Sequence, residues 1–270
     1  MVLATWRPQR LGTIRGGRPR DAAGQTPPDK RDVPQVVVVH GAGSFGHFQA
    51  REHGVSKGAS DPAFSWRGFG LTRASVCRLN GLCLDALLDA GVAAVGASPF
   101  ADFGATRGRG VVPAAARRRG LARVRELLRR GMVPVLHGDA VLDELQGASI
   151  LSGDVLVDLL SDALRPKLCV FLTDVAGVFD RPPSEPGAAL IPRLVVGRDG
   201  TMRLPETSES AHDVTGGIRA KLEAAAAIAR GGTPVVVVQV GTPHALAALR
   251  GEVPEVCTLV VAEGRRRGDF

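Results

Sequence analysis

Residues 36–47 read Val-Val-Val-Val-His-Gly-Ala-Gly-Ser-Phe-Gly-His, and no other stretch of the chain carries as much information. Four consecutive β-branched residues suit a strand that is buried on both faces, as in a parallel sheet. Gly41, Gly43 and Gly46 follow, and glycine lets bare backbone N–H groups approach a ligand closely. Because successive N–H groups form an anion-binding concavity, the stretch predicts a phosphate ligand at the end of a buried strand.

From residue 34 onward, strand-like and helix-like segments alternate. The apolar runs are 35–39, 92–98, 132–136, 168–172, 234–240 and 257–261, and the helical patterns are 72–90, 115–130, 154–164, 216–230 and 243–250. Strands separated by helices of this length predict βαβ crossovers and an α/β fold with a mainly parallel sheet. Ligands of such sheets bind at the carboxyl ends of the strands.

The charge of the chain comes almost entirely from arginine. Only four of the 34 basic residues are lysines, and the formal net charge is +7. The chain has no tyrosine and few other aromatic residues to stack on bases, so nucleic-acid binding is not expected. No apolar run approaches the roughly 18 residues of a membrane span. We expect a cytoplasmic protein without nucleic-acid or membrane partners.

The sequence lacks the spacings of a metal site. The four cysteines, Cys77, Cys83, Cys169 and Cys257, form no C-x-x-C pair, and no H-E-x-x-H motif occurs. A protein-bound zinc site is therefore not expected.

Three classes of enzyme could use the glycine stretch. Gly41–Gly46 fits the dinucleotide fingerprint G-x-G-x-x-G, but the acid at the required distance, Asp61, lies in a Ser-Asp-Pro turn. A phosphoryl-transfer enzyme is a second class, without a P-loop because no G-x-x-x-x-G-K-[ST] occurs. A hydrolase is the third, with Ser44 as nucleophile and the partners in the required order, namely Asp174 or Asp180 and then His212 or His244.

Further glycine motifs favour phosphoryl transfer. His137-Gly138-Asp139 ends one predicted strand, Thr173 to Asp180 end another, and Ser152-Gly153-Asp154 opens a helix. Asp213-Val214-Thr215-Gly216-Gly217 leads into the helix that carries Lys221, and a glycine pair at a helix N-terminus is a second anion site. Two anion sites, a lysine and acids suit a reaction in which positioning and charge neutralisation do most of the catalysis.

The ordered set of motifs resembles the amino acid kinase superfamily, and the Ser-Phe-Gly-His ending resembles the isopentenyl phosphate kinase family within it. The resemblance covers about residues 34–262. Additional segments that look like this family are Gly68-Phe69, Thr72-Arg73, Leu79-Asn80 and Ser98-Pro99-Phe100.

The resemblance implies an αβα sandwich, usually a homodimer, that uses ATP and Mg²⁺ to phosphorylate a small phosphate acceptor, isopentenyl phosphate. Residues 34–270 would form the kinase domain, with an acceptor half over about 34–165 and a nucleotide half over about 166–270. A kinase of another small phosphate or phosphonate, or a catalytically impaired nucleotide-binding module, is the alternative.

Site residues follow from the same resemblance. His47 would bind the acceptor phosphate, Lys221 would neutralise the transferring group, and Asp154 would orient the catalytic lysines. Backbone at Ala42, Gly43 and Gly153 would contact phosphates. The nucleotide site would comprise Gly43, Thr173, Asp174, Gly177, Val178, Asp180, Gly217 and Lys221.

The N-terminus departs from the pattern. The family opens with a strand that ends in Lys-x-Gly-Gly-Ser, whereas the nearest match here, residues 13–18, has Ile14 in place of the lysine and Arg15 and Arg18 nearby. Residues 1–33 are rich in arginine, proline and glycine, so we expect an irregular leader without the family's first strand. Arginine does not replace the point charge of a lysine, so weak activity is expected.

Overall fold

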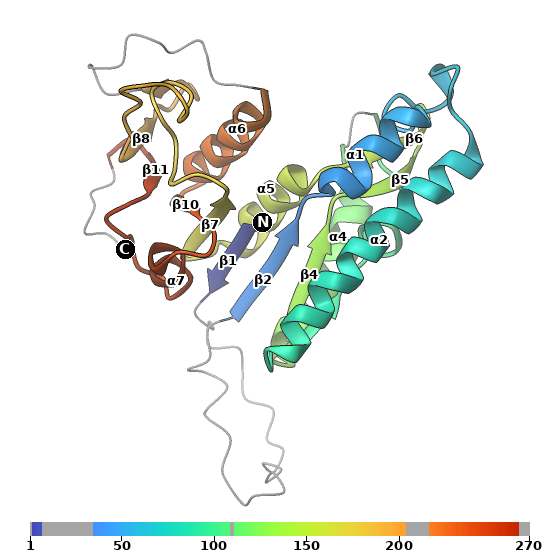
Figure 1. The fold of residues 1–270 in the computed structure, drawn as a ribbon. Helices are drawn as coiled ribbons and strands as arrows, with labels where there is room; N and C mark the ends of the chain where they lie inside the picture. The colour runs from blue at the N-terminus through green and yellow to red at the C-terminus, as the bar shows by residue number, and fades with distance from the viewer. Residues whose placement is uncertain (1, 7–34, 109–110, 204–215, 265–270) are drawn as a thin grey trace, which may run out of the picture.

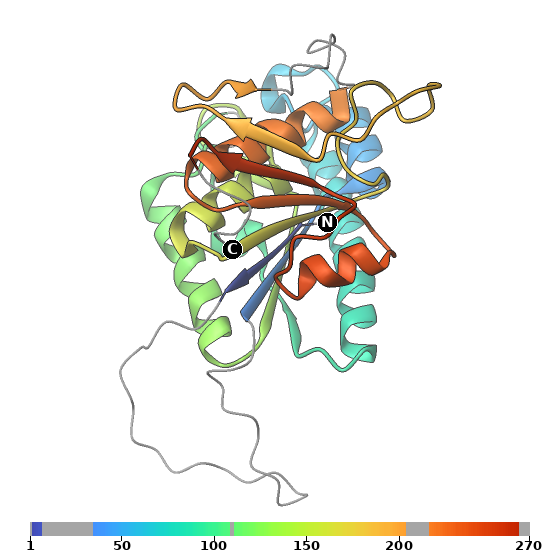
Figure 2. The same cartoon turned by 90° about the vertical axis from the view of Figure 1, so that its left-hand side faces the viewer.

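The computed structural model describes residues 2–6, 35–108, 111–203 and 216–264. A nine-stranded sheet forms the centre, with helices on both faces (Figure 1). Figure 2 shows helices α4, α5 and α6 on one face and α1, α2 and α7 on the other. The predicted αβα sandwich is therefore confirmed.

The elements have the following bounds. The helices are α1 (Gly43–Glu52), α2 (Trp66–Asp89), α3 (Pro99–Asp102), α4 (Ala114–Arg129), α5 (Gly153–Leu164), α6 (Gly216–Arg230) and α7 (Pro243–Leu249), with a 3-10 helix η1 (Gly58–Ser60). The strands are β1 (Val2–Trp6), β2 (Gln35–His40), β3 (Ala94–Gly96), β4 (Val133–His137), β5 (Asp139–Asp143), β6 (Gly147–Leu151), β7 (Leu168–Thr173), β8 (Arg193–Val196), β9 (Met202–Arg203), β10 (Val235–Gln239) and β11 (Thr258–Ala262). None of the described helices is long and apolar enough to cross a membrane.

The valine run of β2 is buried on both sides, as its composition predicts. Val37 and Val39 belong to the core that α4, α5 and α6 cover, whereas Val38 belongs to the opposite core, with α7 and part of α2. Alternate side chains of a strand point to opposite faces, so an unbroken apolar run fills both layers.

The sheet order is β3-β4-β2-β1-β7-β10-β11-β8-β9, and β5 and β6 form a separate hairpin. Strands β3, β4, β2, β7 and β10 all run in one direction, since β2 and β7 are both antiparallel to β1. The carboxyl ends of these five strands therefore lie at one edge of the sheet.

Strand β1 corrects the expectation that the leader is irregular throughout. Val2–Trp6 lie between β2 and β7, and Ala4 pairs with Val37 on one side and Cys169 on the other. Its direction is opposite to that of both neighbours, so Trp6 lies at the far edge of the sheet from the strand ends above. Residues 13–18, which contain Arg15 and Arg18, lie outside the described residues.

Strand register brings four chain positions level at the carboxyl edge. His40 pairs with His137, so Gly41 and Gly138 follow at the same height on β2 and β4. Val2 of β1 pairs with Val39 of β2 on one side and with Phe171 of β7 on the other, so the ends of β2 and β7 are level. Thr173, at the end of β7, pairs in turn with Gln239 of β10. The two predicted glycine motifs and the end of β7 thus meet at one edge, as expected for parallel strands.

Two expectations from the alternative enzyme classes do not fit the fold. Asp61 follows η1 and accepts a hydrogen bond from the amide of Ala63 at 3.0 Å, so it does not end a second strand as a dinucleotide-binding fold requires. Ser44 lies exposed in the first turn of α1, two residues after a Gly-Ala turn from β2, so one glycine of the G-x-S-x-G elbow is missing. Of the two histidines proposed as its partner, His244 lies in α7 and His212 lies outside the described residues.

Candidate functional site

A small cavity of about 140 Å³ lies at the carboxyl edge, next to the glycine stretch. Five of the residues that the sequence predicted for the site line this cavity, and they come from three separate segments of the chain: Ala42, His47, Gly153, Asp154 and Lys221. Val39, Gly41, Gly138, Ile150 and Ser152 complete its lining. The fold therefore brings the predicted acceptor contacts and the predicted lysine into one space.

Backbone amides converge on this cavity. Helix α1 begins at Gly43, and α5 begins at Gly153, where the Ser152 hydroxyl accepts the amide of Val155 at 3.2 Å. The first N–H groups of a helix have no partner within the helix and carry the positive end of its dipole. Two helix N-termini pointing at one small space make it a site for an anion.

Gly138 is the residue that sequence reasoning passed over. A Cβ at this position would lie 3.5 Å from the amide nitrogens of both Ala42 and Gly153. A side chain here would stand between the two amides and block their access to a ligand. The His-Gly-Asp motif signalled this position, but only the strand register shows that it lies opposite the glycine stretch.

A larger cavity of about 450 Å³ adjoins the first and shares Ala42, His47, Gly138 and Ile150 with it. Its remaining lining consists of two sets of residues. The small or apolar ones are Gly46, Ala50, Val76 and Ala140, and the polar ones are Arg51, Ser56, Thr72 and Asp139. His47, exposed on α1, lies where the two cavities meet. The pair of cavities suits a molecule with an anionic head and an apolar tail.

The histidines behind the site are buried. His40 and His137 stack with ring centroids 5.5 Å apart, and His40 Nε2 lies 3.0 Å from Asn80 Oδ1 of α2. Burial lowers the pKa of His137 to about 4. His40 thus ties α2 to the end of β2, which is a structural role rather than a contact to the anion.

Of the residues predicted for the nucleotide site, Thr173 and Asp174 lie at the carboxyl edge of the sheet. The Thr173 hydroxyl donates to the carbonyl of Val175 at 2.8 Å, and the exposed Asp174 accepts on its carbonyl from Gln239 Nε2 at 3.0 Å. Gly217 lies in the first turn of α6, whose N-terminus is the second predicted anion site.

The other three predicted nucleotide contacts have packing partners. A Cβ at Gly177 would lie 2.6 Å from the Thr258 hydroxyl, and that hydroxyl accepts the amide of the buried Val178 at 2.8 Å. Asp180 accepts the amide of Ala189 at 2.8 Å, and this bond lowers its pKa. These residues shape the loop after β7 and line neither cavity.

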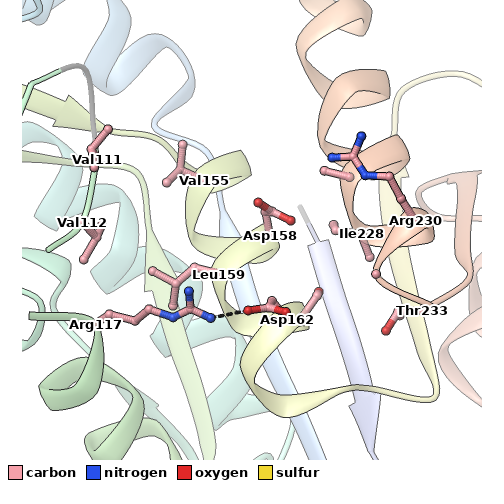
Figure 3. Close-up of a pocket in the computed structure, with 13 residues that line it drawn as sticks. Val111, Val112, Arg117, Val155, Asp158, Leu159, Asp162, Ile228, Arg230 and Thr233 are labelled. Carbon is pink, nitrogen blue, oxygen red and sulfur yellow. Dashed lines mark hydrogen bonds and ion pairs between the residues drawn. The ribbon is translucent and has the colours of Figure 1, made fainter. Parts of the chain in front are cut away.

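A third cavity, of about 390 Å³, lies between α4, α5 and α6 (Figure 3). Arg117 of α4 pairs with Asp162 of α5 in its wall. Burial and the neighbouring Asp162 raise the pKa of Asp158. None of the predicted site residues lines this cavity.

Comparison with known proteins agrees with this geometry. The sequence model of the amino acid kinase family matches residues 28–239. The chain belongs to the amino acid kinase family. Among its relatives, isopentenyl phosphate kinase of Arabidopsis thaliana is 45% identical over 232 residues, which cover 81% of this chain and 68% of that protein. The isopentenyl phosphate kinase of Methanothermobacter thermautotrophicus is 34% identical over 223 residues, covering 80% and 81%.

A solved structure of isopentenyl phosphate kinase superposes with a TM-score of 0.67 at 30% identity, covering 83% of each chain. The family likeness thus extends from the motifs to the fold. Among the described residues, no group of three or more histidine, cysteine or acidic side chains could hold a metal ion.

Proposed function

We propose that this chain transfers the γ-phosphoryl group of ATP to isopentenyl phosphate and so forms isopentenyl diphosphate. The observation that carries the proposal is the meeting of an amide-lined cavity and a mostly apolar cavity at His47. Relatives with this name cover most of the chain at up to 45% identity. An acceptor with a phosphate head and a five-carbon tail matches both spaces.

The acceptor phosphate takes the smaller cavity. A phosphate monoester is largely dianionic at pH 7, because its second pKa is about 6, so it attacks without a general base. The amides of Ala42 and Gly153 and the ring of His47 hold it with one oxygen free. That oxygen forms the new bond to the γ-phosphorus as the bond to the β-phosphate oxygen of ATP breaks and ADP leaves.

Lys221 neutralises the charge that would otherwise keep the two anions apart. Its side chain reaches the small cavity from α6, opposite the start of α5. Asp154, in the first turn of α5, lines the same cavity and would orient the ammonium group. Magnesium, when bound with ATP, would supply further positive charge to the phosphate groups. Fixed positive groups in a confined site contribute most to this kind of transfer.

The tail of the acceptor takes the larger cavity. Ala50, Val76 and Ala140 are buried in its wall, with Ile150 beside them. Each methylene group removed from water contributes about 0.8 kcal/mol, so a five-carbon tail is a substantial part of the affinity. Inorganic phosphate is therefore expected to be a poor acceptor.

The test is ATP-dependent formation of isopentenyl diphosphate by the purified chain, followed by phosphorus NMR. A new diphosphate signal that depends on enzyme, ATP and acceptor supports the proposal. Tight ATP binding without turnover on isopentenyl phosphate would instead identify a nucleotide-binding module, and turnover on an alkyl phosphonate alone would identify another acceptor. The homodimer that the family resemblance implies is tested separately by light scattering.

A further inference from the structure

We infer that Asp139 and Arg73 form a positioning pair for the acceptor, which holds α2 and α3 against the strand end and so sets the wall of the larger cavity. The inference rests on the proposed function, because it concerns the same cavity. Neither residue was assigned a role by the motifs or the comparisons.

A single guanidinium group joins three elements. Arg73 of α2 places its Nε 3.6 Å from Asp139 Oδ2 at the start of β5. Its Nη2 donates to the Ser98 hydroxyl, the N-cap of α3, at 3.0 Å. The same group lies over the ring of Phe100 in α3, 4.2 Å from the ring centroid. The arginine therefore fixes the distance between α2, α3 and β5.

The Asp139 carboxylate is buried at a cost to the fold. Its side chain is fully buried, and neither oxygen makes a well-formed hydrogen bond, nor does Arg73 Nε. The amides of Phe100 and Ala140 and the charge of Arg73 offset the burial only in part, and the pKa of Asp139 is raised to about 6. Natural proteins keep such locally unfavourable groups mainly where the site needs them.

The position of Asp139 links the pair to the phosphate. It directly follows Gly138, which lies between the amides of Ala42 and Gly153. It also lines the larger cavity together with Thr72, the residue before Arg73 on α2. A shift of the Arg73–Asp139 pair would therefore move Gly138, next to the proposed phosphate site, and also the wall of the larger cavity, which is proposed to hold the tail.

The same strand provides a matched control. Asp143 ends β5 and is also buried, but its oxygens accept hydrogen bonds from the Thr106 hydroxyl and from the amides of Gly108, Leu145 and Gln146 at 2.7 to 3.1 Å. It lines neither of the two cavities at the carboxyl edge. Asp143 is thus a buried acid of β5 whose contacts are structural.

The experiment compares Asp139→Asn, Asp143→Asn and wild type in steady-state kinetics and thermal unfolding. Asp139→Asn is expected to raise the KM for isopentenyl phosphate about tenfold, while the KM for ATP changes little and the Tm is unchanged or higher. Asp143→Asn is expected to lower the Tm and leave both KM values near wild type. An unchanged acceptor KM in Asp139→Asn, or equal rises in both KM values, would overturn the inference.

A second pair of variants keeps the test decisive. Arg73→Met leaves the carboxylate without its cation and is expected to lower the Tm, and Asp139→Asn in the same chain is expected to restore it. Wild-type turnover in the same assay decides the proposed function by itself. If wild type does not turn over, binding of isopentenyl phosphate by calorimetry still compares Asp139→Asn with wild type, and equal affinities would reject the pair.

Discussion

His137 and Asp139 flank Gly138 on one short stretch of chain, and burial shifts their pKa values in opposite directions. The pKa of His137 falls to about 4, and that of Asp139 rises to about 6, in both cases chiefly through desolvation. Each residue is held in its neutral form more strongly in the folded than in the unfolded protein. Their effects on the free energy of unfolding therefore oppose each other over the same pH range.

Removing one of the two groups should expose the effect of the other. The folded-state pKa of His137 lies below its unfolded value, so its contribution to the free energy of unfolding is complete above about pH 6.5 and is lost as the pH falls toward 4. The loss is on the order of 3 kcal/mol. Asp139 has a raised pKa, so its contribution to the free energy of unfolding is present below about pH 4 and is lost as the pH rises through 6. In Asp139→Asn, the free energy of unfolding is expected to fall more steeply than in wild type as the pH drops from 6.5 to 4.

Urea unfolding at several pH values measures this slope. His137→Asn serves as the reciprocal variant, and its free energy of unfolding is expected to increase, relative to wild type at each pH, as the pH drops over the same interval. Parallel curves for wild type and both variants would contradict the opposing shifts.

Lys221→Ala should lower turnover more than binding. The ammonium group neutralises the phosphoryl group during transfer, and losing such a contact costs about 10²–10³ in rate. We expect kcat to fall by this factor while the acceptor KM changes little. Lys167→Ala, at an exposed lysine next to the start of β7 and away from the carboxyl edge, is the control and should keep wild-type turnover.

His47→Ala should weaken use of the acceptor more than binding of ATP. The imidazole lies where the two cavities meet, so its loss removes a donor to the acceptor phosphate. A rise in acceptor KM of about tenfold, corresponding to one charge-assisted hydrogen bond, is expected in initial-rate measurements. Ser44→Ala, in the same helix, should be silent; if it abolishes activity, a hydrolase with a serine nucleophile must be reconsidered.

Gly138→Ala should reduce activity while leaving the stability of the fold nearly unchanged. The new methyl group would meet the amides of Ala42 and Gly153 at 3.5 Å, an ordinary contact distance that the fold tolerates. It would nevertheless occupy space beside the acceptor phosphate, so we expect near-normal Tm and strongly reduced kcat/KM. Gly70→Ala on α2 has open space around its Cβ and should instead stabilise the protein by about 0.5–1 kcal/mol, with unchanged kinetics.

The sequence predicted the elements that have a clear hydrophobic period or run. Strand β2 and helix α6 match the apolar run at 35–39 and the helical pattern at 216–230 almost residue for residue, because burial on both faces or on one stripe dictates their composition. Helix α1 was not predicted, since two glycines lower its intrinsic helix propensity and its packing on α2 offsets them. The hairpin of β5 and β6 was missed because buried Asp139 and Asp143 interrupt the apolar pattern.

The sequence motifs predicted five of the residues that line the small cavity, but they did not predict how these residues are arranged around it. Asp154 was recognised from the Ser152-Gly153-Asp154 motif and Lys221 from the glycine pair that precedes it, and both line the small cavity. Gly138 and Asp139 depend on strand register and on the position of α2, which no local pattern encodes. Val178 was predicted at the nucleotide because of its motif, although its side chain belongs to the core.

The antiparallel strand β1 also sets a distance. It is the strand that joins β2 to β7 within the described sheet, so the loop after β2, proposed to receive the acceptor, and the loop after β7, proposed to receive the nucleotide, are two strand spacings apart, about 9–10 Å. Main-chain hydrogen bonds maintain this offset, and no side chain of the acceptor pocket takes part in it. Changes in the wall of the larger cavity could thus adapt the protein to acceptors of other sizes without altering the distance between these two loops.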